Sequence, residues 1–181
     1  MIASPRLSQL RFPVRRHFAF VVLLMLPLSR GLADPAADLA FNATIRSQAI
    51  LLFRQGKGAD ATARLQANVR AGSRGGDQHL ETAQQLSDIA FYFLGHRDRA
   101  LAIEAVHEGI SAAQPLFQEK GLDSNRAALF CNLGLAVDQI LHDLATSRSF
   151  YVAALVAEPT NRTASQRLRA VDERISWKGK S

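Results

Sequence analysis

The chain has 181 residues, with 22 basic and 16 acidic side chains, a net charge of +6 and a single cysteine. Five arginines and no acidic residue fall within residues 1–33, so residues 34–181 carry 17 basic against 16 acidic side chains. A nearly neutral body argues against a nucleic-acid binder, which needs a basic patch interleaved with aromatic residues. The single cysteine, Cys131, excludes an intrachain disulfide.

Residues 1–33 have the successive regions of a signal peptide. A basic segment from Arg6 to His17 precedes the apolar run Phe18–Leu28, and Gly31–Ala33 supplies the small residues of a cleavage site. The run is shorter than the roughly 20 residues that a membrane-spanning helix needs. We expect cleavage after residue 33 and export to the periplasm or out of the cell. An uncleaved leader anchored in the inner membrane is the alternative, and a pair of adjacent arginines leaves the twin-arginine route open.

Residues 34–176 are predicted to form one all-α domain. Apolar residues recur there every three or four positions, as in Phe41, Ile45 and Ala49, and no alternating strand pattern appears. The polar breaks between helical stretches are Gly56–Gly58, Ala71–Asp77, Glu119–Ser124 and Glu158–Asn161. Asp77 is the predicted N-cap of one helix, and either Asp123 or Ser124 is the predicted N-cap of a later one.

Two later segments have distinct roles. The stretch 127–144 is apolar nearly all round, which predicts a central helix. Residues 160–175 are apolar on one face only, which is typical of a helix that caps the end of a stack. Residues 177–181 are expected to be a short basic tail.

A degenerate repeat is the most specific signal in the chain. It places an aromatic, a Leu-Gly pair, a second aromatic, a small residue and a proline at fixed spacing, and weaker copies precede it. The predicted packing positions are Ala49 and Ala61 in the first copy, Gly95 and Ala100 in the second, and Phe130, Leu133, Gly134, Phe150, Ala153 and Pro159 in the third. This pattern resembles the tetratricopeptide repeat (TPR).

The TPR resemblance implies about three antiparallel helix hairpins, stacked as a short superhelix, and a C-terminal capping helix. Such arrays are typically non-catalytic scaffolds that bind a protein or peptide in a concave groove lined by the first helix of each hairpin. Here the groove positions would be Gln84, Asp88, Tyr92, Asp138 and Gln139. An irregular helical bundle with a merely solvated polar face is the alternative.

No motif for a cofactor, a nucleophile or a phosphate loop is present. His107 and Glu108 begin like a zinc-protease helix, but Ser111 stands where the second histidine is required. Asp138 with His142, and Glu104 with His107, could each offer a metal two ligands, where a structural site needs four. We therefore expect neither an enzyme nor a metal protein. A small periplasmic helical enzyme or metal-binding bundle that uses these four residues is the rival hypothesis.

The C-terminal segment gathers most of the remaining basic charge. Its basic residues are Arg162, Arg167, Arg169, Arg174, Lys178 and Lys180, and Trp177 lies among them. Asp172 and Glu173 dilute this charge, so we expect a solvated cap. A contact with anionic membrane headgroups is the alternative.

Overall fold

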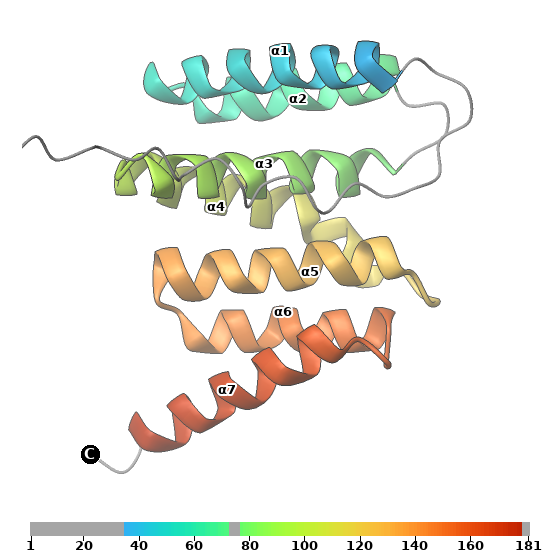
Figure 1. The fold of residues 1–181 in the computed structure, drawn as a ribbon, viewed down its shortest axis with the longest axis vertical. Helices are drawn as coiled ribbons and strands as arrows, with labels where there is room; N and C mark the ends of the chain where they lie inside the picture. The colour runs from blue at the N-terminus through green and yellow to red at the C-terminus, as the bar shows by residue number, and fades with distance from the viewer. Residues whose placement is uncertain (1–34, 73–76, 179–181) are drawn as a thin grey trace, which may run out of the picture. The chain divides into compact units, whose positions relative to one another are not determined.

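The computed structural model describes residues 35–72 and 77–178, and within these residues the chain forms seven α-helices and no strand (Figure 1). The predicted leader, residues 1–33, lies outside the described residues. The α-helices are α1 (Pro35–Arg54), α2 (Gly58–Gly72), α3 (Gln78–Gly95), α4 (Arg99–Ala113), α5 (Ser124–Ala136), α6 (Leu144–Ala157) and α7 (Arg162–Lys178). A 3₁₀ segment, η1 (Gln114–Gln118), extends α4, and a π-helical turn, η2 (Val137–Leu141), extends α5.

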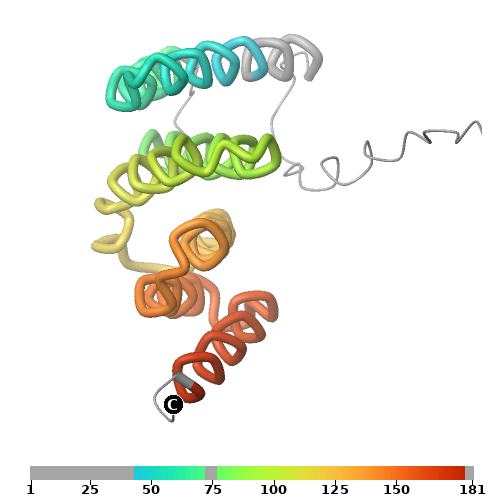
Figure 2. The backbone as a smooth tube through the Cα atoms, turned by 90° about the vertical axis from the view of Figure 1, so that its left-hand side faces the viewer, coloured from blue at the N-terminus to red at the C-terminus, as the bar shows by residue number. Residues whose placement is uncertain are grey.

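The helices form antiparallel hairpins that stack in chain order. The pairs are α1 with α2, α3 with α4, and α5 with α6, and α7 packs on α6 at the end (Figures 1 and 2). Contacts of α3 with both α2 and α5 join one hairpin to the next. The predicted all-α stack of about three hairpins with a capping helix is therefore confirmed.

The three hairpin turns share one backbone feature. Gly56, Arg97 and His142 each have a positive φ, of 70°, 61° and 58°, and each lies two residues before the second helix of its hairpin. In the first two turns the next amide donates back to the preceding helix: Lys57 N to Leu52 O at 3.0 Å, and Asp98 N to Phe93 O at 2.9 Å. These are Schellman-type endings. The hairpins are thus built as structural repeats.

The second helices show the same repetition in their side chains. Their fourth residues are small and fully buried, and their eighth residues are large and fully buried. The small set is Ala61, Ala102 and Ser147, and the large set is Leu65, Val106 and Tyr151. The small residue lets the paired helix approach, and the large one fills the space beyond it. The repeat is therefore 41 residues long between the first two hairpins and 45 between the last two.

Aspartates begin four of the helices. The predicted N-caps are confirmed: Asp77 accepts from His79 N and Leu80 N, and Asp123 accepts from the amides of Asn125 and Arg126. Asp98 and Asp143 cap α4 and α6 in the same way. Each cap satisfies amides that a helix start leaves without partners.

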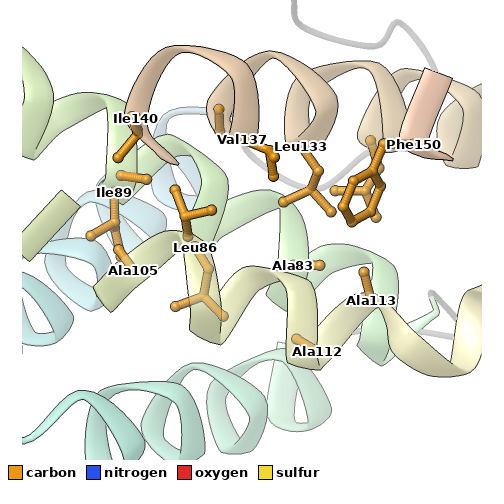
Figure 3. Packing of buried hydrophobic residues seen from close by; sticks show 14 of the residues in the cluster. Ala83, Leu86, Ile89, Ala105, Ala112, Ala113, Leu133, Val137, Ile140 and Phe150 are labelled. Atoms are coloured by element: carbon orange, nitrogen blue, oxygen red, sulfur yellow. The ribbon is translucent and has the colours of Figure 1, made fainter. Parts of the chain in front are cut away.

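One hydrophobic core runs through the described hairpins. Figure 3 shows part of it, where Leu86 and Ile89 of α3 and Ala105 of α4 lie close to Val137 and Ile140. All five side chains have no exposed surface. Because each hairpin buries its apolar residues against its neighbour, α5 is central as predicted.

Several predicted packing positions differ from the structure. Gly95, Ala100 and Pro159 are exposed, and a Cβ on Gly95 would meet no atom within 4 Å, so these three do not separate packed helices. Ala102, two residues beyond Ala100, takes the small buried position instead. The other predicted positions lie in the core, with Ala153 only partly buried: Ala49, Ala61, Phe130, Leu133, Gly134, Phe150 and Ala153.

Two element boundaries also differ. The helical stretch before the predicted polar break at Glu119 is not one α-helix: α4 ends at Ala113 and continues as the 3₁₀ segment η1 from Gln114, with Pro115 in its first turn. Proline has no amide hydrogen to continue the ladder. Trp177 belongs to α7 and not to a separate tail.

Candidate binding surfaces

The first predicted groove cluster lies on α3. Gln84, Asp88 and Tyr92 are spaced four residues apart and therefore share one face of the helix. Gln84 Nε2 donates to Asp88 Oδ1 at 3.5 Å, and the Arg46 guanidinium of α1 lies 3.2 Å from Asp88 Oδ2. Burial raises the pKa of the Asp88 carboxyl above its ordinary value, although Arg46 and Gln84 act in the opposite direction. This carboxylate thus joins neighbouring hairpins.

Tyr92 lies one turn beyond Asp88 and stacks on His96. The two ring centroids are 4.1 Å apart, and His96 Nδ1 lies 2.8 Å from the Tyr92 carbonyl. Tyr92 is half-buried, whereas His96 is exposed. The pair forms an aromatic edge that a ligand could contact.

The second predicted cluster lies in η2. Asp138 accepts two hydrogen bonds from Arg174 Nη1 of α7, at 2.7 and 2.6 Å, while Gln139 is exposed. Within the described residues, no hydrogen bond or ion pair joins Asp138 or Gln139 to Gln84, Asp88 or Tyr92. Both predicted groove carboxylates are therefore held by an arginine of an adjacent helix.

The residues of the metal hypothesis do not converge in the described part of the chain. No group of three His, Cys, Asp or Glu side chains is close enough there to hold an ion. Asp138 is bound to Arg174, and His142 Nδ1 contacts the Asp138 carbonyl at 3.1 Å rather than its carboxylate. Glu104 lies against Gly58, and His107 is exposed.

A surface hollow of about 370 Å³ lies where η1, the start of α5 and the outer face of α6 meet. Its apolar lining includes Phe117 of η1, Phe130 of α5, and Val152 and Val156 of α6. The Phe117 ring lies 4.8 Å from that of Phe130 and 5.4 Å from that of Phe150, centroid to centroid. Figure 2 shows the segment that joins α4 and α5 at the left edge of the stack. The hollow therefore has an aromatic floor fixed by core packing.

Two arginines line the hollow at different places. Arg126 is almost fully buried; its Nη1 donates to Glu119 Oε2 at 2.8 Å, and its Nη2 donates to the Gly121 carbonyl. Arg148 is half-exposed, and its Nε donates to Asp172 Oδ1 of α7 at 2.7 Å. Arg126 thus fixes the loop 119–123, while Arg148 presents charge at the rim.

Exposed apolar side chains concentrate around this hollow. Of the seven large hydrophobic residues exposed in the described part of the chain, three line it: Phe117 at 42%, Val152 at 37% and Val156 at 70%. Leu122, at 78%, lies beside it, because the neighbouring Asp123 amide donates to the carbonyl of the lining residue Ala157 at 2.9 Å. We call Phe117, Leu122, Val152 and Val156 the apolar patch. Such gatherings are typical of interaction surfaces.

The patch was not predicted, although the sequence contains one signal for it. The stretch 150–157 is apolar at every position, so a helix that buries one face must expose some of these residues. Arg148, Val152 and Val156 are four residues apart and mark that outer face. The aromatic partner, Phe117, comes from a different hairpin and could not be paired with them from spacing alone.

The basic C-terminal segment lies in α7. Trp177 is 78% exposed and Ile175 38% exposed, whereas Val171 and Ala164 are buried. Arg174 and Asp172 are committed to ion pairs with η2 and α6. Contact of this segment with anionic membrane headgroups remains the alternative hypothesis. Within residues 35–72 and 77–178, no helix is both long and apolar enough to cross a bilayer.

Comparisons with known proteins return no match: no family model, no curated protein and no solved structure is similar to the chain.

Proposed function

We propose that the protein is an exported, non-catalytic scaffold or adaptor that binds a protein or peptide partner. The stacked hairpins of the described residues support this proposal, because each hairpin adds to the extended surface of the array. The single observation that carries it is the apolar patch: of the seven large hydrophobic residues exposed in residues 35–72 and 77–178, three line one hollow and a fourth, Leu122, lies beside it. The signal-like leader supports export to the periplasm or beyond.

The groove on the first helices is the second candidate surface for the same function. It is favoured by the stacked Tyr92 and His96 rings beside Asp88, which offer aromatic and polar contacts to a peptide. Its carboxylates are already paired with arginines, so a ligand there would have to share or displace those pairs. The patch needs no such rearrangement.

Affinity capture from the native compartment tests the proposal. The full chain, Val156→Asp, Leu51→Asp and Tyr92→Ala serve as baits. Val156 and Leu51 are both exposed valine or leucine side chains on helices, at 70% and 54%, so the two aspartates are matched. We expect Val156→Asp to reduce partner recovery at least about tenfold, because a charge cannot be buried in an apolar contact.

The Leu51→Asp and Tyr92→Ala baits show which results would contradict the assignment of the site to the patch. Leu51→Asp should recover the partner normally, and equal losses for both aspartates would contradict the patch assignment. A loss confined to Tyr92→Ala would move the site to the groove. Mass spectrometry of the chain purified from the same compartment should find Asp34 as its N-terminus, whereas a retained leader would contradict cleavage.

A further inference from the structure

The apolar patch extends along the outer face of α6. Arg148, Val152 and Val156 follow one another at intervals of four residues, so they form a stripe along the helix. Phe117 approaches this stripe from η1, and Ala153 and Ala157 line the same hollow. The residues that line the hollow therefore run along α6 from Arg148 to Ala157, and we call this part of the hollow the apolar channel.

The two ends of the channel differ in charge. Arg148 lies near the start of α6, while Glu119, whose side chain is 43% exposed, belongs to the loop fixed against its end through Arg126 and the bond from Asp123 to Ala157. The nine helical steps from Arg148 to Ala157 span roughly 13 Å. A cation thus marks one end of the apolar channel and an anion marks the other.

From these features we propose that the channel binds one face of an amphipathic helix, with two apolar side chains one turn apart, a carboxylate facing Arg148 and a cation facing Glu119. This inference rests on the proposed function and specifies the chemistry of the partner. Apolar side chains spaced by four residues on a helix match the spacing of Val152 and Val156.

Arg148 can bind a second carboxylate while it keeps its present partner. Its Nε is bonded to Asp172, and a guanidinium has four further N–H donors. Glu119 is likewise paired with Arg126 through one oxygen only. Both ends of the channel therefore retain capacity for a charged ligand without loss of the bonds that fix the fold.

The test uses a lactam-stabilised helical peptide of about 16 residues, long enough to be helical in water. It carries two leucines four residues apart, a glutamate four residues before the first and a lysine four residues after the second. Fluorescence anisotropy measures its binding to the full chain. Replacing both leucines by serine should abolish binding, and replacing the glutamate by glutamine should weaken it about threefold or more.

Protein variants locate the contact. Arg148→Gln should weaken binding of the peptide that carries glutamate and have little effect on binding of the peptide that carries glutamine. The effects of the protein change and of the peptide change are therefore not additive. Asp172→Asn is the matched control, because it breaks the same ion pair between α6 and α7 but leaves the Arg148 cation in place. An equal loss with Asp172→Asn would mean that the effect is structural and would overturn the proposal.

The remaining outcomes separate this inference from the proposed function. If Val156→Asp abolishes partner capture but all peptides bind equally or none binds, the amphipathic-helix inference fails and the scaffold proposal stands. If Val156→Asp halves the mass of the chain measured by sedimentation, the patch holds a second copy of the chain, and the inference is also overturned. If Val156→Asp changes neither capture nor peptide binding, both fail.

Discussion

Close packing between paired helices depends on single small residues. A Cβ on Gly134 would stand 2.8 Å from Cε1 of Tyr151, a ring that is itself fully buried. Ser147, also buried, donates to the Gly134 carbonyl at 2.9 Å. The α5–α6 hairpin therefore has no room for a methyl group at this position.

We predict that Gly134→Ala lowers the free energy of unfolding by about 1–3 kcal/mol, because the Tyr151 ring must move to admit the methyl group. Gly95→Ala is the matched control: Gly95 is also helical, but a methyl group there meets no atom within 4 Å. Urea denaturation followed by circular dichroism measures both. Equal stability of the two variants would contradict the packing at Gly134.

Cys131 carries a thiol whose reactivity the fold lowers. Burial raises its thiol pKa to about 11, with a further contribution from Glu158. Because the thiolate is the reactive form, we predict slow alkylation of the native protein near pH 7.5 and a rate that still rises about tenfold per pH unit through pH 10. A rate in the native protein that levels off near pH 9 would contradict the raised pKa.

The hairpin turn is the element that repeats most faithfully. Gly56 occupies the left-handed position in the first hairpin, but Arg97 and His142 occupy it in the others. A non-glycine residue in this conformation costs roughly 1–2 kcal/mol relative to the right-handed region, part of which glycine loses again to its greater freedom in the unfolded chain.

We predict that Arg97→Gly raises the free energy of unfolding by up to about 1 kcal/mol, because glycine relieves this strain. Arg97 is exposed, so no core contact is lost. The shift of the urea midpoint, at an unchanged denaturation slope, measures this change in the free energy of unfolding. As a control, Arg54→Gly lies within the last turn of α1 and should lower the free energy of unfolding. Destabilisation by Arg97→Gly would contradict the left-handed assignment.

The helices could be predicted from the sequence because burial imposes a period of three to four on their apolar residues, and the caps at Asp77 and Asp123 because short acidic side chains suit helix starts. The register of the second hairpin could not be predicted from the sequence. Its turn has Arg97, and not a glycine, in the left-handed conformation. The nearby Gly95 suggested a different alignment of the repeat, which assigned Ala100 to the small buried position that Ala102 occupies in the structure.

The candidate binding surfaces were harder still to predict, because they form between elements. The arginine partners of Asp88 and Asp138 come from α1 and α7, more than 30 residues away in each case, and no local pattern links them. The patch likewise joins Phe117 of η1 to Val152 and Val156 of α6. Such surfaces follow from the stacking of hairpins and not from the periodicity of any one helix.

At the scale of the whole molecule, the charge has a different meaning from the one suggested by its total of +6. Most of the excess lies in residues 1–33, and the body that follows is nearly neutral. In that body, Arg46, Arg148 and Arg174 form ion pairs between neighbouring helical elements, and Arg126 fixes the loop before α5. The proposed binding surface is accordingly apolar, with charge only at its ends.

Site-specific photo-crosslinking in the living cell tests the central claim that this apolar patch binds a protein partner. A benzophenone amino acid is placed at Val152 in one variant and at Leu51 in the matched control, both exposed helical positions. We predict that irradiation gives a discrete crosslinked species of higher mass from position 152 and none from position 51. Crosslinks of equal yield from both positions, or none from position 152, would contradict the account.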